Sequence, residues 1–362
     1  MKFGRTINDL AVELDRQQKA KKDYLLDTRN LIMDADSTME TLTITNDKTG
    51  ESIILRLNDV AHSQISSYLG IPAKYYNKMR DDNPELLASN VNSWFRKEPD
   101  RRMLRTLDGT ARAFLSDRYR RIDNYEIAQT VLPIIASMKD AKIESCEVTD
   151  ERMYLKVVNP RLTTEVVPGD IVQSGIMITN SEVGLGSMTI QPLVYRLVCK
   201  NGMVVNDAKT RKYHVGRGNE AGEDYTLYSD ETLKADDHAL MLKVKDTISS
   251  VVDQTRFERV VSLMRDAKNA KIETNNIPKM IELAAADFGM TKKEGESVLD
   301  YLIRGEDLSL YGLANSITRA AQDVKSYDRS TTLESIGYSV MGMSASKWNK
   351  LNALQDVEAV VA

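Results

Sequence analysis

The segment from Thr110 to Ile135 constrains the fold most, because it has the pattern of a strand, a tight turn and a helix in direct succession. Its first residues alternate between two sides, which is typical of a half-buried strand. One side carries Ala111, Ala113 and Leu115, and the other carries Arg112, Phe114 and Ser116. The segment therefore predicts a core-forming strand and helix joined by a short connection.

That connection, here called the arginine turn, carries Arg118, Arg120 and Arg121. Asp123 or Asn124 is expected to cap the helix that follows, whose apolar residues share one face. These apolar residues are Ile127, Val131, Ile134 and Ile135. Arginine presents a planar fork of donors and keeps its charge, as phosphate recognition requires. The arginine turn thus indicates a phosphate-binding surface, although the residues alone leave a solvated charged turn open.

Length and composition indicate an intracellular globular protein. The chain has 362 residues, enough for two domains or for one domain with helical additions, and its hydrophobic content of 42% is ordinary. No apolar run approaches the roughly 20 residues that a bilayer-spanning helix needs, and the N-terminus lacks a signal-peptide core. We therefore expect a cytoplasmic protein with no membrane partner.

The cysteines and histidines argue against metal or thiol chemistry. Cys146 and Cys199 are too few for a disulfide framework and do not sit in a metal-ligand spacing. The three histidines are far apart in the sequence. We expect no metal, and no nucleotide-binding or hydrolase motif suggests a cofactor or catalysis.

Charge is distributed unevenly along a chain whose net charge is −4. Residues 96–121 hold nine basic and four acidic side chains, whereas acidic residues concentrate in 218–237. A second cationic group follows the predicted sheet, beside Tyr213. This group consists of Lys209, Arg211, Lys212 and Arg217. A basic patch on an acidic protein indicates a localised binding surface or an oligomer contact.

The order of helical and strand patterns along the chain predicts an α+β fold. We expect a mixed, mostly antiparallel sheet with a backing helix, flanked by N- and C-terminal helical segments. Residues 1–35 are expected to form a polar arm, and 36–105 a small hairpin with a helical subdomain. Residues 106–220 are expected to form the central sheet domain, with hairpin turns near Asp150 and Gly202. Residues 221–362 are predicted to be helical.

Three blocks of sequence resemble the phage/plasmid-like protein family, a domain family of unknown function carried by bacteriophages and plasmids. They are FLSDRYRRIDNYE, TNSEVGLGSMTIQPLVYRLVCKNGM and LYGLANSITRAAQDVKSYDRSTTLESIGY. The resemblance runs in order over roughly residues 36 to 345 and implies a cytoplasmic, mobile-element context in a bacterial host. The order of elements is also similar to the core of phage single-strand annealing proteins of the RecT, Erf and Red-beta types. That likeness implies rings or filaments that hold DNA in a basic groove.

These observations lead to the hypothesis of an accessory protein that binds and anneals single-stranded DNA without ATP, in phage or plasmid recombination or replication. Aromatic side chains near a cationic groove can hold single strands without reading sequence. The DNA backbone is expected to lie along Arg112, Arg118, Arg120 and Arg121, with Lys209, Arg211, Lys212 and Arg217 closing the groove. Tyr119 and Tyr213 are expected to stack against bases.

Two alternatives stay open. The first is an oligomeric protein-interaction or host-takeover factor, in which the arginines pair with the acidic segment of a neighbour. The second is a metal-dependent nucleic-acid enzyme with a site around Asp117, Asn180 and Glu182. We expect a homo-oligomer in any case, because the Met-rich helical C-terminus exceeds what one compact sheet can cover.

Overall fold

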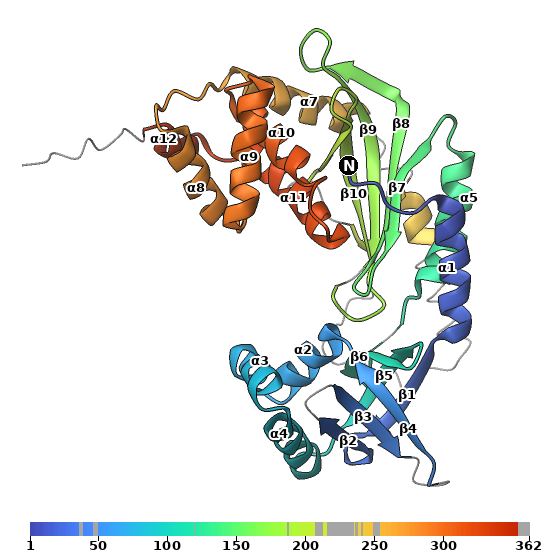
Figure 1. Cartoon of the computed structure of the whole chain (residues 1–362). Coiled ribbons are helices and arrows are strands. Elements are labelled where there is room, and N and C mark those ends of the chain that lie inside the picture. Colours follow the sequence, from blue (N-terminus) through green and yellow to red (C-terminus); the bar gives the residue numbers. More distant parts are fainter. Residues whose placement is uncertain are drawn as a thin grey trace, which may run out of the picture.

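The computed structural model describes residues 1–35, 39–45, 50–119, 121–186, 188–206, 213–215, 235, 238–239, 242–248 and 254–353. These residues form two sheets and their flanking helices, which confirms the predicted α+β class. The N-terminal sheet lies in the lower part of Figure 1, and the second sheet lies above it beside the C-terminal helices. Among the described residues, no helix is long and apolar enough to cross a membrane.

The first sheet has six strands in the order β1-β5-β6-β4-β3-β2. Neighbouring strands are antiparallel, except that β4 and β6 run parallel. The strands are β1 (Lys22–Asp27), β2 (Leu31–Ala35), β3 (Glu40–Thr45), β4 (Ser52–Leu57), β5 (Arg101–Leu107) and β6 (Thr110–Ser116), with the short 3-10 helix η1 (Thr28–Asn30) after β1. The β3–β4 hairpin follows the alternation expected from the sequence.

Three helices pack against this sheet, namely α2 (Asp59–Tyr68), α3 (Ala73–Asp82) and α4 (Pro84–Lys97). The side chain of Asn58 caps α2 by accepting the N–H of Ala61, and that of Asn83 caps α4 in the same way. The buried rings of Phe95 and Phe114 stack with centroids 5.8 Å apart. They join α4 to β6 through the apolar core.

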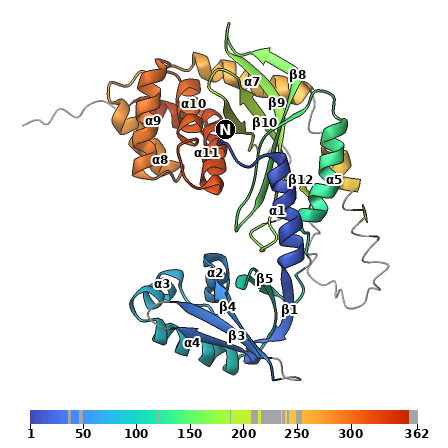
Figure 2. The same ribbon diagram turned by 45° about the vertical axis from the view of Figure 1, so that its right-hand side comes forward.

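The second sheet is antiparallel, in the order β11-β10-β9-β8-β7, and β12 also pairs with β10. The strands are β7 (Lys142–Val148), β8 (Met153–Glu165), β9 (Ile171–Asn180), β10 (Met188–Arg196), β11 (Asn201–Val204) and β12 (Tyr213–Val215). Helices α1 (Ile7–Ala20) and α5 (Asn124–Ser137) pack on one face, as Figure 2 shows. The predicted backing helix and the predicted turn near Asp150 are therefore confirmed.

The C-terminal helices cover the opposite face of this sheet (Figures 1 and 2). They are α7 (Gln254–Asn269), α8 (Ile277–Asp287), α9 (Lys292–Gly305), α10 (Leu310–Ala320), α11 (Tyr327–Met341) and α12 (Ala345–Asn352). Helix α10 is buried along nearly its whole length between its neighbours. Met264, Met280 and Met341 lie inside this core. Their burial removes the exposed Met-rich surface from which we expected oligomerisation.

The position of β6 differs from the prediction. The sequence pattern placed Thr110–Ser116 in the central sheet with α5, but β6 pairs with β5 and β4 in the N-terminal sheet. The expected boundary between residues 105 and 106 falls inside β5. Strand pairing depends on partners distant in the sequence, which alternation within one strand cannot identify.

Residues 1–35 also differ from the expected polar arm. Leu10 and Leu14 of α1 are buried against α5 and the second sheet, while β1 is hydrogen-bonded to β5. Ile7, Leu10 and Leu14 share one face of α1 and give it an apolar stripe that a solvated arm would lack. The expected turn at Gly202 lies slightly earlier, at 197–200, and Gly202 itself is in β11.

Candidate functional site

Arg112 does not line an open groove. It is buried, and its Nη2 donates to Glu182 Oε2 over 2.6 Å. A buried guanidinium paired with a buried carboxylate has little capacity left for a phosphate. Burial and this ion pair leave Arg112 poorly placed to contact a DNA backbone.

The arginine turn is only partly available to a ligand. Arg118 is exposed, whereas Arg121 donates to Asp23 Oδ2 over 2.5 Å. Tyr119 is half-buried, and its hydroxyl donates to the carbonyl of Ser181 over 3.3 Å. Burial also raises the pKa of the Tyr119 hydroxyl. Its ring is therefore poorly placed to stack against a base.

Of the remaining predicted contacts, only the backbone of Tyr213 is described. Arg120, Lys209, Arg211, Lys212 and Arg217 lie outside the described residues. Tyr213 begins β12, where its backbone is opposite Ile190 of β10.

A buried ionic network instead connects the two sheets. Arg105 has no exposed side-chain surface, and it donates to Asp23 and to Asp123 over 2.9 and 2.7 Å. Lys21 also pairs with Asp123 over 2.5 Å. Burial alone would raise the pKa of both aspartates. The charge and hydrogen bonds of Arg105, together with those of Arg121 at Asp23 and of Lys21 at Asp123, outweigh burial and hold each pKa below its usual value. This network fixes β1, β5 and the start of α5 relative to one another.

Glu182 belongs to the same junction. Its Oε1 accepts the backbone N–H of Asn124 at the start of α5 over 2.6 Å, so both carboxylate oxygens have partners. Asp123, at the N-cap position, makes no capping hydrogen bond of its own. Asn180 donates to the side chain of Asn124, whereas Asp117 lies on the exposed turn. In the part of the chain that the structure describes, no group of three or more potential ligands is arranged to hold a metal.

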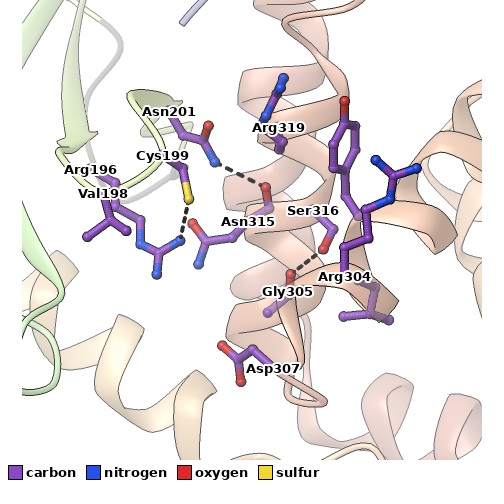
Figure 3. A pocket seen from close by; sticks show the side chains of 13 residues that line it. Arg196, Val198, Cys199, Asn201, Arg304, Gly305, Asp307, Asn315, Ser316 and Arg319 are labelled. Carbon is purple, nitrogen blue, oxygen red and sulfur yellow. Dashed lines mark hydrogen bonds between the residues drawn. The ribbon is translucent and has the colours of Figure 1, made fainter.

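A pocket that the sequence did not reveal lies between the β10–β11 connection and helices α9 and α10 (Figure 3). Its volume is about 340 Å³. Three guanidiniums line it, and a single carboxylate accompanies them. The arginines are Arg196, Arg304 and Arg319, and the carboxylate is Asp307. We call this site the arginine pocket.

Arg196 is held rigidly on the sheet side of the arginine pocket. Its Nε and Nη2 donate to the carboxylate of Asp170 over 2.5 and 2.9 Å, and the hydroxyl of Tyr311 also donates to Asp170. The remaining nitrogen, Nη1, lies 3.4 Å from Cys199 Sγ (Figure 3). Arg196 and Cys199 both line the cavity, whereas Asp170 does not.

The other two arginines come from the helices and are more exposed. Arg304 pairs with Asp300 one turn back on α9, with its side chain 71% exposed. Arg319 pairs with Asp323 and lies over the ring of Tyr301, 4.7 Å from its centroid. Neither of these aspartates lines the cavity. The two guanidiniums therefore keep nitrogens for a ligand.

Neutral polar groups form the inner wall of the arginine pocket. Asn201 is buried and donates to the carbonyl of Asn315, while the hydroxyl of Ser316 donates to the carbonyl of Gly312. The lining residues come from two stretches about a hundred residues apart in the sequence, 196–201 and 301–319. No local motif joins them, which is why sequence reasoning missed the site.

Comparison with known proteins gives one match. The family model described as Domain of unknown function (DUF932) matches residues 113–356, more than half of the chain. No curated protein and no solved structure matches this chain. Every residue that lines the arginine pocket lies within the matched segment. The chain therefore belongs to the family of the Domain of unknown function (DUF932).

Proposed function

We propose that this protein binds single-stranded DNA without ATP, as an annealing accessory factor in phage or plasmid recombination or replication. The observation that carries the proposal is the arginine pocket, whose lining includes Arg196, Arg304 and Arg319. Arginine is suited to phosphate because its planar donors can bind two oxygens at once. The proposed contact surface thus moves from Arg112 to this pocket.

The aromatic and polar parts of the pocket also support a nucleic-acid ligand. Tyr301 lines the cavity beside Arg319, and such pairs of an aromatic ring and a cation occur where proteins hold bases and backbone together. The exposed Arg118 remains a candidate for a further backbone contact.

Fluorescence anisotropy with a labelled oligo-dT, titrated at several salt concentrations, tests the proposal. The logarithm of affinity should fall linearly with the logarithm of salt concentration, by about 0.7 per phosphate contact for a single strand. The double variant Arg304→Ala/Arg319→Ala should bind at least tenfold more weakly and with a smaller slope. Arg161→Ala is the matched control, because Arg161 is half-exposed, pairs with Asp140 and does not line the pocket.

Equal affinity of the parent and the double variant would place DNA binding elsewhere on the surface. No salt-dependent binding by the parent would reject the proposed function altogether. An equal loss in Arg161→Ala would show that net charge, and not the pocket, governs the affinity.

Self-association is a second candidate, because one groove on the N-terminal sheet exposes apolar side chains. Leu25 and Ile53 line this groove, whose volume is about 570 Å³, and they are 45% and 42% exposed. Sedimentation velocity should show an oligomer that Leu25→Asp/Ile53→Asp dissociates. Val12→Asp is the control, because Val12 is 71% exposed on α1 and lies outside the groove. A monomer at micromolar concentration would contradict this candidate.

A further inference from the structure

We propose that residues 1–5 form a releasable strap that fastens the β10–β11 connection to the C-terminal helices, so that its release loosens one wall of the arginine pocket. In Figures 1 and 2 this segment runs from the N-terminus, beside α11, across the second sheet to α1. Such a strap would act in the same way whichever ligand the arginine pocket binds.

The strap is anchored on both walls of the arginine pocket. The amino nitrogen of Met1 donates to the carbonyl of Lys200, in the β10–β11 connection. The ammonium of Lys2 donates to the carbonyl of Val324 over 2.7 Å, in the connection between α10 and α11. Neither Met1 nor Lys2 lines the cavity. The strap therefore links the β10–β11 wall to the helical wall without occupying the pocket.

Met1 sits in a socket that the missing side chain of Gly202 leaves open. A Cβ added at Gly202 would lie 2.2 Å from Met1 Cγ, and Met1 packs on an apolar cluster that includes Tyr154 and Tyr195. The same Cβ would lie 3.4 Å from Glu334 Oε1, a buried oxygen with no hydrogen-bond partner among the described residues. A buried unsatisfied acceptor costs free energy. Because Met1 covers this point, release of the strap would let water reach the oxygen and remove part of that cost.

The hold of the strap on β7 is weak. Arg5 forms an isolated bridge with Cys146, in which its N–H donates to the Cys146 carbonyl over 2.7 Å. Arg5 also pairs with Glu147, but the two side chains are 40% and 21% exposed, and exposed pairs contribute little to stability. The side chain of Phe3 is 79% exposed. Segments held by so little buried surface open locally at low cost while the rest of a fold stays intact.

Two thiols can report on release of the strap, because the chain contains only two cysteines. Cys146 is buried against the strap, where its Sγ donates to the carbonyl of Arg5 over 3.2 Å. Cys199 is half-buried and lines the arginine pocket. Lifting the strap should uncover Cys146, and loosening the β10–β11 wall should speed the modification of Cys199.

Thiol labelling of the folded full chain tests the proposal, with peptide mass spectrometry to assign each cysteine. Gly4→Ala should lift the strap, because its Cβ would lie 2.1 Å from the carbonyl oxygen of Cys146. We expect Gly4→Ala to speed the labelling of Cys146 about tenfold or more and that of Cys199 about threefold or more. Lys2→Ala removes an anchor without adding bulk and should shift both rates in the same direction.

Phe3→Ala is the matched control within the strap and should leave both labelling rates unchanged, because this side chain is exposed. Val91→Ala is the control for a general loss of stability, because Val91 is buried in the core of the first sheet. It should not reproduce the preferential labelling of Cys146. Hydrogen exchange gives a measurement that needs no cysteine: residues 197–203 should exchange faster in Gly4→Ala, with the β3–β4 hairpin at the parental rate.

Faster labelling of both cysteines with faster exchange at 197–203 would support the proposal, and Lys2→Ala alone suffices if Gly4→Ala does not fold. Labelling of Cys146 that neither strap variant changes would overturn it, because the strap would then not be releasable. Faster labelling of Cys146 with parental rates at Cys199 and at 197–203 would also overturn it, because the strap would then not fasten the pocket wall. An equal rise at Cys146 in Val91→Ala would reject it too, since labelling would then reflect general unfolding.

Discussion

Lys156 Nζ donates to Glu334 Oε2 over 2.6 Å, and neither side chain has any exposed surface. The pair joins β8 of the second sheet to α11. Thr331 accepts a further hydrogen bond from Lys156 over 2.9 Å, and the ring of Tyr327 lies 4.7 Å from the same nitrogen. One buried cation thus holds the helical layer to the sheet through three residues of α11.

Replacing Lys156 alone should destabilise the protein strongly. Lys156→Met leaves the Glu334 carboxylate buried without its partner, and such a loss costs about 3–5 kcal/mol. Urea unfolding of Lys156→Met should show this deficit. The double variant Lys156→Met/Glu334→Leu should recover a large part of it, because it removes both buried charges. If Lys156→Met is as stable as the parent, the ion pair between Lys156 and Glu334 does not form in solution.

Arg112 and Arg118, which were both expected to contact DNA, should contribute very differently to the free energy of unfolding. Arg112→Ala leaves Glu182 buried without its cation and should cost about 3–5 kcal/mol of unfolding free energy. Arg118→Ala removes an exposed side chain and should change the free energy of unfolding by less than about 0.5 kcal/mol. Chemical denaturation of both variants checks the difference. Similar effects at the two positions would argue against the burial of β6.

The ion pair between Glu294 and Arg329 predicts a pH-dependent stability. The hydrogen bond from Arg329 is the main reason why the pKa of Glu294 falls to about 2, whereas an unfolded glutamate has a pKa of about 4.3. Because the folded pKa is lowered, the contribution is complete above about pH 4.3 and is lost as the pH falls toward about 2.

Glu294→Gln should therefore be less stable than the parent at neutral pH, by about 1 kcal/mol for this mostly buried, capped pair. The difference should shrink as the solution is acidified through that range. Arg329→Gln removes the same pair from α11 and should show the same trend. A deficit that stays constant down to pH 2 would mean that the ionised Glu294 carboxylate is not the source of the lost stability.

The crossing of α10 and α11 depends on Gly337. A Cβ added there would lie 2.5 Å from Thr318 Cγ2 and 3.0 Å from the carbonyl oxygen of Ala314. Gly337→Ala should therefore force the helices apart and cost about 1–3 kcal/mol, as overpacking does. Gly305→Ala is the control, because its added Cβ would meet nothing within 4 Å. Thermal unfolding should show a lower midpoint for the first variant only.

Local patterns predicted the elements better than their partners. The small hairpin expected within residues 36–105 is the β3–β4 pair, whose two strands are neighbours in the sequence. The pairing of β6 with β4 depends on a strand more than fifty residues away in the sequence. Glu182 was a candidate residue of the enzyme alternative, and its actual partners, Arg112 and Asn124, lie far upstream in the sequence. The arginine pocket was hidden for the same reason.

The place of β6 bears on how this protein can be divided. The DUF932 match begins at Ala113, in the middle of β6, whose neighbours β4 and β5 both lie upstream of the match. A fragment cut at that residue would keep Glu182 but lose Arg112, and would retain half a strand with no sheet to join. We therefore expect a fragment that begins at Ala113 to be less stable than the full chain, because a cut that keeps the first sheet together has to lie upstream of β1.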